Sequence, residues 1–370
     1  MLILSKKKKC LMHFMILYLS DRSRKYDQDI IVLSGHYTLP CLYFWRQKTK
    51  TIMSAIRPNL CPHITEEVAN ELKSVGVKTV SDFIRMDLEH LAQETTISFK
   101  DLAVIRRLLL ARFSTFPVNG TDFYQTAIDS SSILPTSVNK LNELLDGGLY
   151  TSEVTEVAGE ISSGKTQLCL SCCVSVVMTA RQNVVYIDTC GGFSADRLAE
   201  IAESLYGEEH LEHILQSVKV VEAFDIFQLM SALQTIKEQM VIKNDSFFET
   251  LKLIIVDSIT AVIYPTLGGQ QMDGHSLMVQ LSLKMKHLAA DFSLAVLVIN
   301  NVNGDGKVSL GKTWSHVPHS RLIISHHRDH MPNIREVMLV KSSRLATGSK
   351  VMLKITEKGI EDMTLIEDMT

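Results

Sequence analysis

Short apolar runs alternate with longer amphipathic stretches over the second part of the chain. Three runs are apolar up to a polar end: Val184–Asp188, Leu253–Asp257 and Val296–Asn301. Val154–Ala158 also has strand character, although it contains Thr and Glu. Continuous apolar runs of this length are typical of strands buried on both faces of a parallel sheet. The stretches between them are long enough to form helices. The pattern therefore predicts an α/β domain with a mostly parallel sheet flanked by helices, over residues 136–358.

A helical pattern without strand-like runs precedes this region, over residues 53–113. Thr65 is a suitable N-cap for a first helix, and Gly76 is expected to end it. Ser81 is expected to cap the next helix, and residues 101–113 have the periodicity of an amphipathic last helix. We therefore expect a small all-α domain of the helix-hairpin-helix kind before the α/β domain.

The hairpin Ser74–Lys78, between the first two of these helices, has the form of a nucleic-acid backbone contact. Its N–H groups and Lys78 can bind phosphate oxygens, which positions a protein without reading sequence. A helical bundle that docks other proteins has the same pattern. Both interpretations stay open at this point.

Three further segments differ in composition from these two domains. Residues 1–52 hold 10 Lys or Arg against 3 Asp or Glu, a net charge of +7. We expect a disordered or mispredicted extension there, with Met53 as a suitable start. Residues 114–135 contain Pro117 and Asn119-Gly120 and predict a linker, and residues 359–370 are expected to be a tail.

The charge balance limits the partners of the main part of the chain. The formal charge of −3 and the +7 of the first 52 residues leave −10 for residues 53–370, so nucleic-acid contact must come from local patches. The 7 cysteines form no regular framework, which fits a reducing compartment. The apolar run Leu11–Leu19 is too short to span a bilayer, and we expect no membrane partner.

The strongest motif follows the run Val154–Ala158. It reads G-x-x-x-x-G-K-T and consists of Gly159, Glu160, Ile161, Ser162, Ser163, Gly164, Lys165 and Thr166. Its glycines let backbone N–H groups surround a polyphosphate. Lys165 supplies a cation to the β- and γ-phosphates, and the Thr166 hydroxyl can ligate Mg²⁺.

Asp257 completes this motif from the end of a later apolar run, as a Walker B acid does. An acid at the carboxyl end of a strand reaches Mg²⁺ directly or through water. The two motifs predict ATP and Mg²⁺ as cofactors. Lys165 and Asp257 are the candidate catalytic residues, and Thr166 and Asp257 the candidate metal ligands.

The segments around the phosphate loop resemble the core of RecA-like recombinases. Val138–Leu149 and Glu153–Val157 match the opening of that core, and the helical domain is similar to that of the Rad-fifty-one branch. The likeness is greatest to the D-type paralogues of this branch. It rests on Leu60–Pro62, Phe116–Gly120, Gly191–Gly192, Leu267–Gln271, Leu310–Ser315 and Val317–Pro318, and it covers about residues 53–358.

The resemblance implies a nuclear protein of homologous-recombination DNA repair that binds ATP and Mg²⁺. It also implies assembly with other recombinase paralogues, with a C-type and an X-type neighbour, and contact with single-stranded DNA. The family's DNA-binding loops fall on Tyr264–Gly274 and on Asn303–Trp314. The second of these loops contains Lys307 and Lys312.

Three positions depart from the family's pattern. Ser152 replaces a usual Gly before the first core strand. Phe113-Ser-Thr-Phe116 stands where filament-forming members carry Phe-x-x-Ala, which argues against self-polymerisation. Cys190 follows Asp188-Thr189, where the family carries its catalytic Glu. A thiol is mostly protonated at neutral pH and is a poor general base.

Two functions remain open from the sequence. The first is a weak DNA-dependent ATPase that assists assembly of a recombinase filament, with Glu160 or Glu153 as a substitute base. The second is an assembly subunit in which ATP is purely structural and partners make the DNA contact, which Cys190 favours. A phosphotransferase acting on a small substrate finds no acceptor-binding motif.

Overall fold

The computed structural model describes residues 55–363, apart from residues 59, 114–116, 268–272, 305 and 328–331. The extension predicted at residues 1–52 lies outside the described residues. Within the described part of the chain, no helix combines the length and the apolar character needed to cross a membrane.

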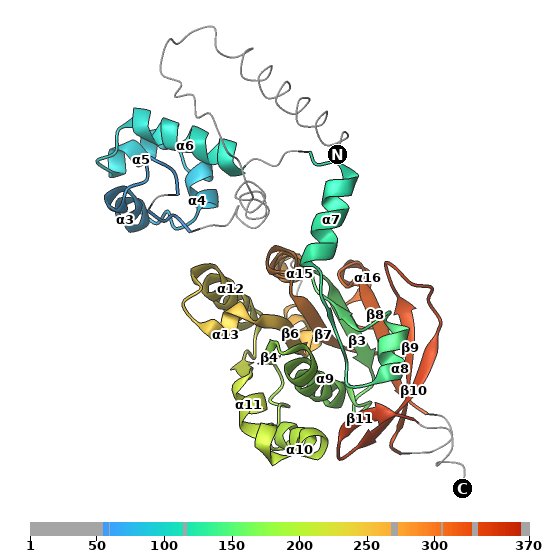
Figure 1. Ribbon diagram of the computed structural model, residues 1–370. Helices are drawn as coiled ribbons and strands as arrows, with labels where there is room; N and C mark the ends of the chain where they lie inside the picture. The colour runs from blue at the N-terminus through green and yellow to red at the C-terminus, as the bar shows by residue number, and fades with distance from the viewer. Residues whose placement is uncertain are drawn as a thin grey trace, which may run out of the picture. The chain divides into compact units, whose positions relative to one another are not determined.

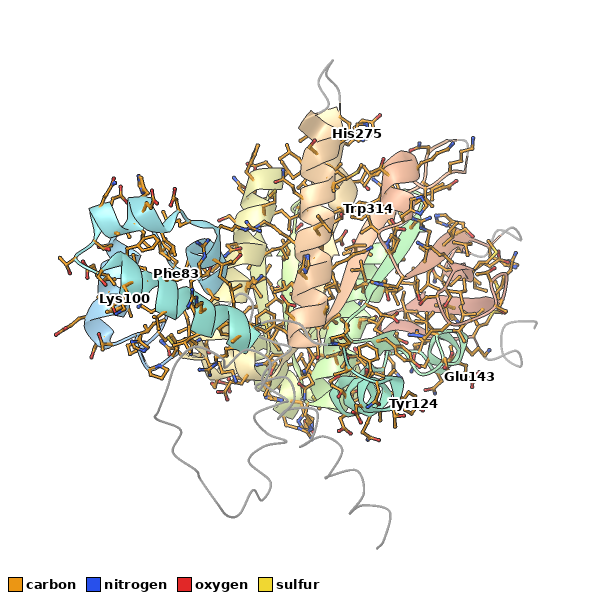
Figure 2. The ribbon with its side chains drawn as sticks, turned by 90° about the horizontal axis from the view of Figure 1, so that it is seen from above. Phe83, Lys100, Tyr124, Glu143, His275 and Trp314 are labelled. Atoms are coloured by element: carbon orange, nitrogen blue, oxygen red, sulfur yellow. The ribbon has the colours of Figure 1, made fainter. Side chains whose placement is uncertain are left out.

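Four helices form the N-terminal helical region around a hydrophobic cluster of their own. Its largest fully buried side chain is Phe83, which Figure 2 labels among these helices. The first helix begins after Thr65, whose side chain accepts a hydrogen bond from the Val68 N–H, as the sequence predicts. The helices are α3 (Glu66–Ser74), α4 (Val80–Arg85), α5 (Leu88–Glu94) and α6 (Phe99–Phe113).

The predicted cap of the second helix is wrong. Ser81 lies inside α4, and Thr79 is the N-cap. The Thr79 hydroxyl accepts the Asp82 N–H at 3.1 Å, and the Asp82 carboxylate accepts the Thr79 N–H at 2.9 Å. This reciprocal capping box satisfies two backbone donors, which Ser81 could not do with Ile84 three residues later.

A nine-stranded sheet forms the core of the second region (Figure 1). Its order is β11-β10-β9-β8-β3-β7-β6-β4-β5, parallel from β5 to β8 and antiparallel from β8 to β11. The strands are β3 (Val154–Gly159), β4 (Asn183–Asp188), β5 (Val218–Glu222), β6 (Leu251–Asp257), β7 (Ala295–Asn301), β8 (Ser320–His326), β9 (Ile334–Lys341), β10 (Lys350–Thr356) and β11 (Gly359–Asp362).

Each face of the sheet carries its own hydrophobic cluster. Along β4, Tyr186 belongs to one cluster and Val185 and Ile187 to the other, because successive side chains of a strand point to opposite faces. The first cluster includes residues of α8 (Asn139–Leu144), α9 (Lys165–Ala180), α10 (Ala195–Tyr206) and α11 (Leu211–Gln216). The second includes residues of α12 (Ile226–Ile242), α13 (Ser246–Glu249), α14 (Ile259–Ile263), α15 (Asp273–Phe292) and α16 (Gly311–Ser315). The predicted α/β fold with a preceding helical region is confirmed.

Two segments differ from the sequence prediction. The stretch predicted as a linker contains the helix α7 (Gly120–Ser130), which Asn119 caps by accepting the Asp122 N–H at 2.9 Å. The predicted tail begins with β11, which pairs with β10, so the sheet continues to residue 362. The remaining short elements are β1 (Ile133–Leu134), β2 (Leu149–Tyr150), and the 3-10 turns η2 (Glu208–His210) and η3 (Tyr264–Leu267).

The register of the parallel strands brings the predicted site residues to one edge. Gly159 at the end of β3 is paired with Asn301 at the end of β7. Asp188 at the end of β4 is paired with Asp257 at the end of β6. Ligands of open α/β sheets bind at the carboxyl ends of the strands, and this edge carries the candidate site.

Candidate nucleotide-binding site

The phosphate loop joins β3 to α9 and requires glycine at both glycine positions of its motif. A Cβ on Gly159 would lie 2.4 Å from the carbonyl oxygen of Ile324, and a Cβ on Gly164 would lie 2.7 Å from Ile355 Cδ1. Gly164 also has a φ of 99° as the N-cap of α9. Such a φ costs free energy for residues with a Cβ. The loop therefore curls closely over the neighbouring strands and opens at the start of a helix.

The side chains of the loop divide into two groups. Ile161 is 85% exposed, and Glu160 and Ser162 are also exposed. Ser163 is fully buried, and its hydroxyl has no hydrogen-bond partner among the described residues. The loop thus has two glycines, which its tight backbone turn requires, and a buried hydroxyl without a hydrogen-bond partner among the described residues. Both features fit the binding of a polyphosphate.

Lys165 and Thr166 lie in the first turn of α9, where the sequence predicts them. Lys165 Nζ donates to the carbonyl oxygens of Gly159 and Glu160 at 2.9 and 2.6 Å, so the lysine spans the loop. Burial lowers the pKa of the Lys165 ammonium, and the nearby Asp257 partly offsets this effect. An anionic ligand would restore favourable charge to this buried cation.

Asp257 lies within reach of the loop and is buried, as a Walker B acid should be. Its Oδ2 accepts a hydrogen bond from Thr166 Oγ1 at 2.7 Å and another from the Tyr186 hydroxyl at 2.8 Å. Thr166 and Asp257 thus place two oxygen donors side by side, which is the type of ligand that Mg²⁺ prefers. The structure brings together these two predicted metal ligands.

Tyr186 is a part of the site that the sequence analysis missed. Burial raises its pKa, and the charge of Asp257 adds to the effect, so the phenol stays protonated and donates to the carboxylate. Its ring contacts that of Phe193, with 4.8 Å between the centroids. The only signal in the sequence was a phenol within the apolar run that ends at Asp188.

Cys190 lies close to Asp188 and Asp257, at the position where the family carries Glu. Asp188 accepts hydrogen bonds from the backbone N–H groups of residues 190–193, which holds the turn after β4. Cys190 Sγ is 3.6 Å from the Ser258 hydroxyl, one residue beyond Asp257. The thiol is exposed, so a longer acidic side chain at this position has room toward solvent.

One of the two substitute bases considered from the sequence is excluded by its place in the sheet. Glu153 precedes β3 at the end opposite to the phosphate loop, and its carboxylate pairs with Arg344 at 2.8 Å. A six-residue strand spans about 20 Å, too far for proton transfer. Glu160 is within the loop and exposed, and it remains a candidate.

The three lysines predicted to contact DNA are all exposed. Lys78 follows α3 in the helical region. Lys307 lies in a small hairpin that an antiparallel bridge between Val302 and Val308 closes, and Lys312 lies in α16. Part of the other predicted DNA loop, residues 268–272, lies outside the described residues.

The base of the loop around residues 303–310 rests on a buried acid that the sequence analysis did not single out. Glu156 in β3 is fully buried and accepts hydrogen bonds from Asn300 Nδ2 and Trp314 Nε1, both at 2.7 Å. It also pairs with Arg321 Nε on β8. Asn300 Nδ2 donates in addition to the Ser309 carbonyl oxygen at 3.2 Å. Figure 2 labels Trp314, which is fully buried in the core.

Two family models match the chain. The model described as "RAD51D, N-terminal domain" matches residues 53–112, and the model described as "Rad51" matches residues 130–363. The two matches together span both of the regions that the structure describes.

Individual relatives agree with these matches. DNA repair protein RAD51 homolog 4 from Bos taurus is 42% identical over 315 residues, which cover 83% of this chain and 97% of that protein. Its counterpart from Mus musculus is 40% identical over 321 residues, with coverages of 84% and 98%. DNA repair and recombination protein RadA from Metallosphaera sedula is 27% identical over 338 residues, with coverages of 86% and 96%. The chain therefore belongs to the Rad51 family of RecA-like recombinases and resembles its D-type paralogues.

Proposed function

We propose that this protein binds MgATP and acts in homologous-recombination DNA repair as a recombinase paralogue in the nucleus. The observation that carries the proposal is the contact between the phosphate loop and the Walker B acid, where Thr166 Oγ1 lies 2.7 Å from Asp257 Oδ2. The matching relatives bear the name of DNA repair proteins, which supports the biological setting.

Each residue of the loop has a physical role in this proposal. Lys165 and the N–H groups of residues 159–166 bind the β- and γ-phosphates. A lysine gains more from a charged phosphate oxygen than from the two carbonyl oxygens that it now contacts. Thr166 and Asp257 hold Mg²⁺, which neutralises charge on the phosphates.

Hydrolysis is slow in this proposal. Cys190 occupies the position from which a carboxylate would orient the attacking water, and a thiol is a poorer hydrogen-bond acceptor for water than a carboxylate. Glu160 remains as a substitute base, but its exposed position leaves it without the fixed orientation that general-base catalysis requires.

Assembly with C-type and X-type paralogues forms the second part of the proposal. Among the described strands, β5 pairs with β4 alone and leaves its other edge open. The apolar side chains of Val220, Phe224 and Phe227 are 42, 55 and 65% exposed on and just after this strand. An open strand with exposed apolar side chains is suited to receive a strand from a neighbouring subunit. In the complex, Lys78, Lys307 and Lys312 contact single-stranded DNA.

The alternative is an assembly subunit in which ATP is purely structural and partners make the DNA contact. Cys190 favours it, because the loop then binds ATP without a base to hydrolyse it. The two functions differ in one observable quantity. ATP turnover that single-stranded DNA increases supports the first, and binding without turnover supports the second.

Equilibrium binding of a fluorescent ATP analogue tests the proposal, on protein purified together with its partners. Lys165→Ala should weaken MgATP by about tenfold to a few hundredfold, since a charge-assisted contact is worth about 1.5–3 kcal/mol. Lys140→Ala, on α8 away from the loop, is the matched control and should bind normally. Unchanged affinity in Lys165→Ala would refute the role of the loop.

A further inference from the structure

Arg335 on β9 is a buried cation directly against the phosphate loop. Its side chain belongs to a residue that is only 6% exposed. Arg335 Nε donates to the Ser163 carbonyl oxygen at 2.9 Å, and Nη1 donates to the carbonyl oxygens of Pro332 and Ile334 at 2.7 and 2.9 Å. Within residues 55–363, gaps aside, no carboxylate pairs with it. Its charge is therefore satisfied by dipoles but not neutralised.

A second arginine, on the adjacent strand, is mostly buried and is neutralised by a carboxylate. Arg321 on β8 pairs through Nε with the carboxylate of Glu156. An unpaired buried charge destabilises a protein, and burial accordingly lowers the pKa of Arg335. The chain thus keeps an uncompensated guanidinium beneath the loop that is proposed to bind a polyanion.

Through its hydrogen bond to the Ser163 carbonyl oxygen, Arg335 can act electrostatically on a ligand of the loop. In a trans peptide the C=O and N–H groups point in opposite directions, so the Ser163 carbonyl faces Arg335 while the Gly164 N–H faces away from it. In the described part of the chain, the Gly164 N–H finds no acceptor. A Cβ on Gly164 would lie 3.8 Å from Arg335 Nε, which confirms how closely the guanidinium underlies this peptide.

A cation bound to a peptide carbonyl strengthens the N–H group at the other end of the same peptide. Hydrogen-bonded groups polarise one another, and the effect is larger in a low-dielectric interior than in water. The Ser163–Gly164 peptide opens into the first turn of α9, whose N-terminal dipole also favours an anion. Arg335, the peptide and the helix therefore act in the same direction.

We infer that Arg335 is a positioning residue of the phosphate loop, whose charge acts on the nucleotide's phosphates through the Ser163–Gly164 peptide. The inference rests on the proposed binding of MgATP. In it, the bound polyphosphate supplies the negative charge that Arg335 lacks within the chain. Removal of the charge should weaken ligands in proportion to the number of their phosphates.

Two substitutions separate the charge of Arg335 from its hydrogen bonds. Arg335→Gln keeps a donor for the Ser163 carbonyl but has no charge, and Arg335→Lys keeps the charge with a single donor group. Arg321→Gln is the matched control, since it removes a buried guanidinium that a carboxylate already neutralises. Binding of MgATP, MgADP and AMP is measured by calorimetry on the full chain with its co-purifying partners, together with the thermal midpoint without nucleotide.

Arg335→Gln should weaken MgATP by about tenfold to a hundredfold, MgADP less, and AMP by less than about threefold. Arg335→Lys should stay within about threefold of the wild type for all three ligands. Arg321→Gln should lower the thermal midpoint and leave the ratio of ATP to AMP affinity unchanged.

The inference is overturned if Arg335→Gln weakens the three ligands equally, or if Arg335→Lys loses as much MgATP affinity as Arg335→Gln. Either result would mean that the shape of the Arg335 side chain, and not its charge, determines nucleotide affinity. If Arg335→Gln does not fold, a loss of tenfold or more in Arg335→Lys alone overturns it. Wild-type protein that does not bind MgATP would refute both proposals, whereas wild-type binding that Arg335→Gln preserves would refute only this one.

Discussion

Glu156 and Asp257 are buried acids on strands of one sheet, but the groups around them differ in kind. Glu156 lies within β3 and receives a guanidinium, an amide and an indole N–H. Asp257 ends β6 and receives two hydroxyl groups. A carboxylate paired with a guanidinium is neutralised within the chain, whereas one held by hydroxyls keeps its charge for a cation from solution. The comparison separates an acid that holds the structure from an acid suited to a ligand.

The same isosteric change at both acids gives the largest expected difference. Glu156→Gln leaves the mostly buried Arg321 as an unpaired cation, and it should lower the free energy of unfolding by about 3–5 kcal/mol. Asp257→Asn removes a charge that forms no ion pair within the described residues and that acts on Lys165 only at longer range, so it should change stability by less than about 1 kcal/mol. It should instead abolish the advantage of MgATP over metal-free ATP.

Urea unfolding followed by circular dichroism measures the first quantity, and ATP binding with and without Mg²⁺ measures the second. Glu336→Gln serves as control, because its pair with Lys350 is exposed and should contribute less than about 1 kcal/mol. Equal destabilisation by Glu156→Gln and Asp257→Asn would contradict the distinction between a structural acid and a ligand-binding acid.

The sequence was sufficient for the parts of the structure that depend on short-range pattern. Strands β4, β6 and β7 follow from continuous apolar runs and β3 from a segment with strand character, and the structure begins and ends each of them within a few residues of the prediction. The phosphate loop and Asp257 also follow, because a local motif and the polar end of a strand are both visible in one dimension. Ser152 has a φ of 67°, which explains why the family favours glycine there.

The remaining features depend on contacts between residues far apart in the chain. Arg335 meets Ser163 and Arg321 meets Glu156 only after the order of the strands is known. Glu156 lies within the run Val154–Ala158, but the sequence analysis did not single it out, because its partners come from three other segments. Helix α7 was missed for a different reason. Pro117 before it and Gly120 at its first position are typical of a linker, and none of its residues is buried.

Cys190 tests whether the region around Asp257 lacks a general base for ATP hydrolysis. Cys190→Glu should raise ATP turnover by about tenfold or more, since a general base typically contributes about 10²–10⁴-fold. ATP affinity should not increase, because the interaction is made mainly in the transition state. Cys190→Gln introduces a side chain of the same length as Glu without its charge, and it should not raise ATP turnover.

Steady-state turnover with and without single-stranded DNA provides the measurement for position 190. Brisk wild-type turnover that Cys190→Glu leaves unchanged would mean that another base, such as Glu160, already serves. The assembly function would then lose its main support.

The smallest effect is expected on DNA binding by the loop around residues 303–310, whose base contacts Glu156 through Asn300. Lys307 and Lys312 are exposed there, and the hydrogen bond from Asn300 to Ser309 ties the loop to the buried cluster. With three to five phosphate contacts, single-stranded DNA affinity should have a salt slope of about −2 to −4, and replacing both lysines by Ala should flatten it by about 1.4. Lys350→Ala, an exposed lysine on β10, should leave the slope unchanged. If the double variant keeps the wild-type slope, this loop does not contact DNA, and Glu156 holds a loop that serves assembly instead.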